Sequence, residues 1–180
     1  KNYYNMTSGT SYAAPHVAGA IALLLEKNPE FTPHEIKSIL VTTSDVITDQ
    51  YKEEFGFNSG GAGRIDLKKA FNSELVFEPS KLMFNLSEQK TSEEHEIIIT
   101  ELNGSIDIEK VEFSYVDNIE FDYRIEDSSL FITSKLINNE IGEFETRAFI
   151  TQNDITYQIP IMVRVSEASI VILEKENELS

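Results

Sequence analysis

The hydrophobic pattern of this 180-residue chain changes near residues 72–73, and this change constrains the fold more than any other feature. Before that point, apolar residues recur at helical spacing and glycines cluster in short loops. After it come short runs rich in Ile, Val, Phe, Tyr and Thr, which is typical of strands. The charge divides at the same place: residues 1–72 carry seven basic and eight acidic side chains, whereas residues 73–180 carry eight basic and 23 acidic ones. We therefore expect a helical part in residues 1–72, an all-β part in residues 73–174 and a frayed tail at residues 175–180.

Two helices are expected in the first part. Residues 11–27 are rich in Ala and apolar on nearly every side, which is typical of a buried helix. Thr32 suits the N-cap of a second helix over residues 32–44, because Pro33 favours the first turn and Glu35 completes a capping box.

A glycine-rich stretch follows the second helix. Residues 60–63 (Gly-Gly-Ala-Gly) predict a tight loop and not a phosphate-binding loop, because no Lys followed by Ser or Thr comes after them. Arg64 and Ile65 then suit a short extended stretch. A final short helix is expected over residues 66–71, with Asp66 near its N-terminus.

The second part predicts an antiparallel β-sandwich, because seven or more short strands fall within about 95 residues. Asn153 and Asp154 lie between two long strands and predict a hairpin turn. The expected strands are residues 75–77, 81–86, 94–102, 106–115, 119–125, 129–134, 143–151 and 155–165, with a further candidate at 169–173.

Composition excludes several classes of function. The net charge of −16 argues against nucleic-acid binding, which needs clustered Lys and Arg, and against anionic membrane surfaces. The longest apolar run, residues 17–25, is far shorter than the roughly 20 residues of a membrane span. The absence of Cys rules out disulfides, Cys-ligated zinc and a thiol nucleophile. Because the chain starts at Lys1 without an initiator Met, we expect it to be part of something longer.

Residues 9–19 (Gly-Thr-Ser-Tyr-Ala-Ala-Pro-His-Val-Ala-Gly) carry the most chemical information. Gly9 allows a tight backbone turn, and Ser11 then falls in the first turn of the expected helix. The first N–H groups of a helix lack partners within the helix, and the helix dipole is positive there. Ser11 can therefore supply both a nucleophilic hydroxyl and an N–H donor for an oxyanion. Pro15 is tolerated so early in the helix because its missing N–H is not needed there.

This stretch resembles the nucleophile motif of the subtilisin-like serine proteases, which is Gly-Thr-Ser-x-Ala-x-Pro followed by His-Val-Ala-Gly. Residues 61–66 (Gly-Ala-Gly-Arg-Ile-Asp) are similar to the segment that closes the family's catalytic domain, so that the resemblance covers about residues 1–72. The fold it implies is the C-terminal, helical remnant of an α/β domain. The β-part resembles, more weakly, the fibronectin-III-like domains that follow many long subtilases.

The resemblance implies that Ser11 attacks a peptide carbonyl, that its N–H binds the oxyanion and that Thr10 shapes the same substrate pocket. In this family the general base His, the orienting Asp and a second oxyanion donor lie upstream of the nucleophile, and their motifs are absent from this chain. We therefore expect an endopeptidase fragment that is inactive alone, whose partners are a protein or peptide substrate and a missing N-terminal part. A secreted or cell-surface location follows from the same resemblance.

The three histidines are not expected to replace the missing base. His16 lies five residues after Ser11, about 140° around the helix, and so points away from it. We expect a structural role for His16, a solvated position for His34 near a helix start, and a surface position for His95 among acidic residues.

Two alternatives remain open. The chain could be a non-catalytic module in which the acidic sandwich binds or stabilises a partner, or a pseudo-protease. No cofactor or metal is required by any motif. Calcium is a weaker possibility, because hard cations prefer several oxygen ligands. The acids that could supply them are Asp107 with Glu109, and Asp117 with Glu120 and Asp122.

Overall fold

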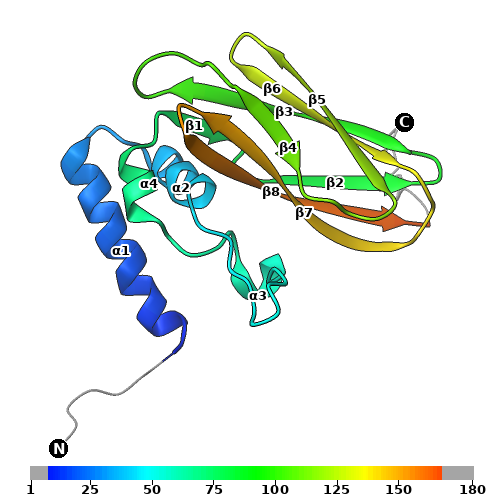
Figure 1. Ribbon diagram of the computed structural model, residues 1–180, viewed down its shortest axis with the longest axis horizontal. Helices are drawn as coiled ribbons and strands as arrows, with labels where there is room; N and C mark the ends of the chain where they lie inside the picture. Colours follow the sequence, from blue (N-terminus) through cyan, green and yellow to red (C-terminus); the bar gives the residue numbers. More distant parts are fainter. Residues whose placement is uncertain (1–7, 168–180) are drawn as a thin grey trace, which may run out of the picture.

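The computed structural model describes residues 8–167, so that the candidate strand at residues 169–173 and the tail at 175–180 lie outside the described residues. The helices precede the strands along the chain, and they lie at one end of the sheet region (Figure 1). The helices are α1 (Thr10–Lys27), α2 (Pro33–Thr42), α3 (Phe57–Gly60) and α4 (Leu67–Phe71).

Local signals set the ends of the helices. The Thr32 side chain accepts a hydrogen bond from Glu35 N, and the Glu35 carboxylate accepts one from Thr32 N, so that the expected capping box of α2 is confirmed. Asp66 caps α4 by accepting a bond from Lys69 N at 2.9 Å. The sequence prediction did not include α3, a single turn within the stretch that contains the glycine-rich loop.

The second part is a sandwich of two four-stranded sheets. One sheet has the order β1-β3-β6-β5 and the other the order β2-β8-β7-β4. With β2 set apart, this is the strand order of a constant-type immunoglobulin domain. Fibronectin type III domains share the two-sheet architecture but not always this strand order. The strands are β1 (Leu75–Glu78), β2 (Leu82–Ser87), β3 (Ser92–Glu101), β4 (Lys110–Phe113), β5 (Ile119–Glu126), β6 (Ser129–Leu136), β7 (Gly142–Gln152) and β8 (Ile155–Ser166).

Two details of the strand prediction are wrong. The sandwich is not wholly antiparallel, because β2 pairs in parallel with β8 over Leu82–Ile161 to Ser87–Ser166. Neighbouring strands can run parallel when the chain crosses between the sheets, as it does from β1 to β2. The strand expected over residues 106–115 is also shorter, since Asp107 N bonds to the Gln152 side chain instead of joining a ladder.

The hairpin between β7 and β8 is confirmed. Asn153 and Asp154 have positive φ values of 50° and 62°, the conformation required at both positions of a type I′ turn. Asn and Asp tolerate this region better than other residues with a Cβ.

The hydrophobic side chains form two cores. The larger fills the sandwich, and its fully buried members include Phe77, Phe84 and Tyr157. The smaller joins α1, α2 and α4 to the sandwich, because Val76 of β1 belongs to the same cluster as Ile39 of α2.

Helix α1 is less buried than its composition predicts. Ala20 and Leu24 are its only buried residues, while Val17 is 38 % and Leu23 is 40 % exposed. An Ala-rich helix becomes buried only if other elements cover it, and residues 8–167 cover only one side of α1. The other side is available for contact.

Candidate functional site

The N-terminus of α1 presents Ser11 on the surface of the described structure. Gly9, the N-cap, has a φ of 144°, which favours glycine, and its carbonyl accepts bonds from Tyr12 N at 3.0 Å and Ala13 N at 3.2 Å. Thr10 and Ser11 are both exposed, and α1 begins at Thr10. This is the predicted placement of Ser11 in the first helical turn, where N–H groups are free for a ligand.

No residue of the described range 8–167 forms a hydrogen bond with the Ser11 hydroxyl. His16, on the same helix, donates from Nδ1 to the Tyr12 carbonyl at 2.7 Å. His34 is exposed, as expected, and its Nδ1 lies 3.8 Å from Glu78 Oε1. An isolated Ser hydroxyl is a weak nucleophile, so that this arrangement needs a base from elsewhere to perform acyl transfer.

His95 is not the simple surface residue that was expected. It lies on the inward-facing side of β3, only half exposed, with its ring edge-on to Phe84 at a centroid distance of 4.7 Å. The alternation of β3, in which Ile97 and Ile99 are buried, places position 95 on the same face. The adjacent Glu94 and Glu96 face outward, because a strand places consecutive residues on opposite faces, whereas His95 shares its face with Ile97 and Ile99.

Two apolar hollows border α1. One, of about 520 Å³, lies between α1 and α2 and is lined by Val17, Ile21 and Leu40 among others. The other, of about 890 Å³, runs along α1 past Ser8 and Gly9 to residues 63–67. Both contain far more apolar than polar surface, which is typical of a face made for packing and not of a small-molecule site with convergent polar groups.

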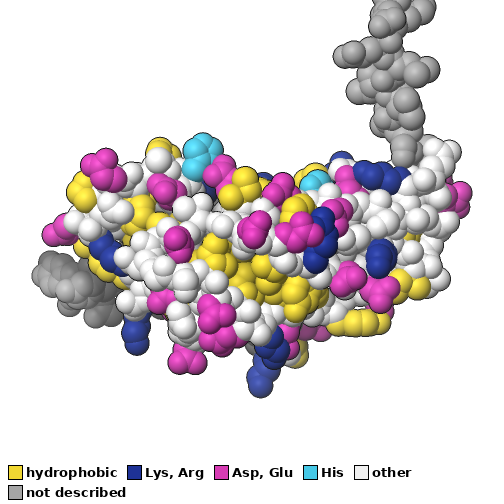
Figure 2. Space-filling model, turned by 90° about the horizontal axis from the view of Figure 1, so that it is seen from above, with side chains coloured by type: hydrophobic (Ala, Val, Ile, Leu, Met, Phe, Trp, Pro, Cys, Tyr) yellow, Lys and Arg dark blue, Asp and Glu magenta, His cyan; other side chains and the backbone are white. Residues whose placement is uncertain are grey.

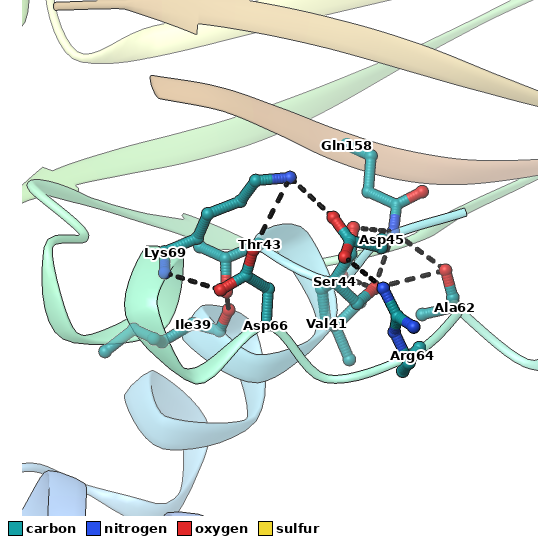
Figure 3. A network of polar contacts seen from close by, with 10 residues as sticks. All are labelled: Ile39, Val41, Thr43, Ser44, Asp45, Ala62, Arg64, Asp66, Lys69 and Gln158. Atoms are coloured by element: carbon teal, nitrogen blue, oxygen red, sulfur yellow. Dashed lines mark hydrogen bonds and ion pairs between the residues drawn. The ribbon is translucent and has the colours of Figure 1, made fainter. Parts of the chain in front are cut away.

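A polar network fixes the stretch that follows α2 (Figure 3). Asp45 accepts bonds from Lys69 Nζ at 2.7 Å and from Arg64 Nη2 at 3.1 Å, and the main chains of Asp45 and Arg64 form a two-bond bridge. The bonds from Lys69 and then Arg64 hold the pKa of the Asp45 carboxyl below its ordinary value. Gln158 of β8 reaches the same place and donates to the carbonyl oxygens of Ser44 and Ala62.

Gly63 permits the close approach of these two chain segments. Its φ is 134°, and an added Cβ would lie 2.1 Å from the Asp45 carbonyl oxygen. We expect Gly63→Ala to lower the free energy of unfolding by about 2–4 kcal/mol, through backbone strain and the loss of bridge hydrogen bonds. Gly104→Ala is the matched control, because Gly104 has a φ of 94° but open space around it. Urea unfolding followed by circular dichroism measures both, and equal effects would contradict the steric explanation.

Sequence reasoning missed the side chains that join the sandwich to the first part. Arg147 of β7 is 2 % exposed and Gln158 of β8 is also 2 % exposed, although both lie on the outer face of their sheet. An outward-facing polar residue in a strand is ordinarily solvated, so that no local signal identifies them. Only the packing of residues 44–62 on this face buries them.

Two of the acids considered for calcium bond to other groups of the chain. Glu109 accepts a bond from Asn153 N, and Asp117 accepts one from the Tyr115 hydroxyl. Within residues 8–167 no three His, Asp or Glu side chains are gathered in a way that could hold a metal ion. Figure 2 shows acidic side chains scattered over one face of the molecule, with hydrophobic side chains between them.

Known proteins resemble the first part of this chain. Residues 1–66 match the subtilase family. Subtilisin-like protease SBT1.6 of Arabidopsis thaliana is 34% identical over 86 residues, which are 43% of this chain and 11% of that protein. Minor extracellular protease Vpr of Bacillus subtilis is 28% identical over 105 residues, 57% of this chain and 13% of that protein.

These matches cover little more than a tenth of the length of the relatives. Among solved structures, titin domain M7 matches 52% of this chain and 95% of its own length, with 5% identity and a TM-score of 0.36.

Helices in residues 8–167 are too short or too polar to cross a membrane. About half of this chain is thus similar to subtilisin-like proteases, and the stretch that matches the subtilase family includes Ser11.

Proposed function

We propose that this chain is the C-terminal part of a subtilisin-like serine endopeptidase, with Ser11 as its nucleophile. The observation that carries the proposal is the complete nucleophile motif of residues 9–19, placed at the exposed start of α1, within the stretch that matches the subtilase family. On this proposal the substrates are proteins or peptides.

The chemistry at Ser11 is acyl transfer. Ser11 Oγ bonds to the carbonyl carbon of the scissile peptide while its proton passes to a histidine base, and the peptide nitrogen leaves with that proton. Water then releases the acyl group. The Ser11 N–H, in the first turn of α1, donates to the developing oxyanion, and Thr10 shapes the pocket beside it.

The base and its orienting carboxylate come from a part of the protein upstream of these residues. We propose that residues 1–72 complete an α/β catalytic domain together with that part, and that its sheet packs on the exposed side of α1. The apolar hollows beside α1 support this packing, because they offer a surface suited to burial against another element. The chain alone is then inactive, because a serine without its base loses several orders of magnitude in rate.

We propose that residues 73–174 are an accessory sandwich of the class shared by immunoglobulin and fibronectin III domains, followed by a tail at residues 175–180. The proposed location is outside the cytoplasm, secreted or on the cell surface, as the name of the B. subtilis relative suggests for that protein. The proposed chemistry requires no cofactor.

Labelling with a fluorophosphonate tests the proposed function. Ser11 Oγ displaces fluoride from phosphorus only when a base takes its proton, so we expect modification of Ser11 in the complete protein, or after the N-terminal part is added to this chain. Peptide mapping by mass spectrometry should show Ser11 modified and the neighbouring Ser8 unmodified. A folded complex in which Ser11 stays unlabelled would contradict its role as the nucleophile.

A further inference from the structure

A buried arginine lies on the outer face of the sandwich, where solvent would normally be. Arg147 of β7 and Gln158 of β8 are adjacent side chains on this face, and Arg147 Nη1 donates to Gln158 Oε1 at 2.7 Å. Residues 44–62 lie over both of them. A guanidinium never loses its charge in a protein, so that its burial is tolerated only with several well-placed acceptors.

The acceptors come from the first part of the chain. Arg147 Nε donates to Glu54 Oε2 at 3.1 Å, and its Nη1 donates to the Ala62 carbonyl at 3.0 Å. Its guanidinium also lies 4.8 Å from the centre of the Phe57 ring. One charged side chain of the sandwich therefore holds three separate positions of the stretch that precedes Gly63.

Gln158 continues this set of contacts. Its Nε2 donates to the Ala62 carbonyl at 2.7 Å and to the Ser44 carbonyl at 2.8 Å, so that it bridges the end of α2 and the glycine-rich loop (Figure 3). A third residue, Glu145 of β7, adds a contact, because its carboxylate accepts a bond from Phe57 N at 2.7 Å. We call Arg147, Gln158 and Glu145 the clamp.

The stretch that the clamp holds lies beside α1, the helix that carries Ser11. Gly63 and Ile65 line the same hollows as Val17 of α1. Ile65 also packs against the small core that contains Ala20 and Leu24 of α1. Ala62, which the clamp holds, is the residue before Gly63.

We propose that Arg147 and Gln158 are positioning residues: they fix residues 44–65 on the sandwich, and through residues 63–65 they set the position of α1 and Ser11. The sandwich is then a fixed part of the catalytic unit and not a hinged module. The effect on Ser11 rests on the proposed function above, whereas the fixing of residues 44–65 does not.

Hydrogen exchange of the 180-residue chain tests the fixing. In Arg147→Met and Gln158→Leu we expect amides of residues 44–65 to exchange at least tenfold faster, while amides of the sandwich core around Ile159 keep their rates. Arg164→Met is the matched control, since Arg164 is a more exposed arginine of β8 whose only ion-pair partner within residues 8–167 is Glu143. Arg147→Lys, which keeps the charge but not the forked donors, should restore protection in part. Unchanged exchange in residues 44–65 of both variants would overturn the proposal.

The labelling rate of Ser11 in the complete protein tests the positioning. We expect Arg147→Met and Gln158→Leu to lower the maximal rate of fluorophosphonate labelling about tenfold or more per folded molecule, with little change in reagent affinity. The reason is that a misplaced nucleophile loses rate and not binding. Faster exchange with an unaltered labelling rate would overturn the positioning role. A wild-type protein that is never labelled would instead contradict the proposed function, and the exchange result would still decide whether the clamp exists.

Discussion

Ser11→Ala in the complete protein is expected to lower kcat for peptide hydrolysis by about six orders of magnitude, the loss measured when the nucleophile of subtilisin itself is removed. On the proposed function no acyl-enzyme forms without the Ser11 hydroxyl, and the residual rate comes from substrate binding and the oxyanion donors. The substitution leaves the Ser11 N–H in place. Hydrolysis of a chromogenic peptide measures the effect.

In the 180-residue chain the same substitution is expected to leave the fold intact. Ser11 is exposed and its hydroxyl has no hydrogen-bond partner within residues 8–167, so that the change in the free energy of unfolding should stay within about 0.5 kcal/mol. Ser8→Ala is the control, since Ser8 is also exposed and lies three residues away. Full activity in Ser11→Ala, or an equal loss in Ser8→Ala, would refute the assignment of the nucleophile.

Phe84→Ala is expected to reduce the free energy of unfolding by about 3–5 kcal/mol, because it removes a fully buried aromatic side chain and leaves a cavity. Phe84 lies in β2 and contacts rings from the opposite sheet, with centroid distances of 4.7 Å to His95 and 6.1 Å to Phe121. Its loss therefore affects the packing of both sheets. A domain of this size has only about 5–15 kcal/mol of stability.

Met83→Ala provides the comparison for Phe84→Ala. Met83 is the preceding residue of β2, points to the outer face and is 48 % exposed. We expect a loss of about 0.5 kcal/mol or less, as for most surface substitutions. Urea unfolding curves followed by circular dichroism give both values. If the two variants were equally stable, Phe84 would not be the core residue that joins the sheets.

Several elements could be predicted because their causes lie within a few residues. The side chains of Thr32 and Glu35 bond to each other's main chain, so that two residues three positions apart determine the start of α2. The turn at Asn153 and Asp154 needs two residues that tolerate positive φ. The strands could be predicted from their alternation of apolar and polar residues. The inward face of His95 in β3 was not predicted, because acidic residues surround it in the sequence.

The remaining features depend on contacts between distant parts of the chain. The composition of α1 indicates an apolar helix, but its burial depends on which other elements cover it, and within residues 8–167 only one side is covered. The parallel pairing of β2 with β8 joins residues about 80 positions apart. Arg147 and Gln158 belong to a strand pattern that is typical of solvent-facing positions, and their burial results from residues 44–62 folding over that face. Hydrophobic period and capping are local properties that a sequence displays directly, whereas burial of a polar face is a property of two surfaces that the fold brings together.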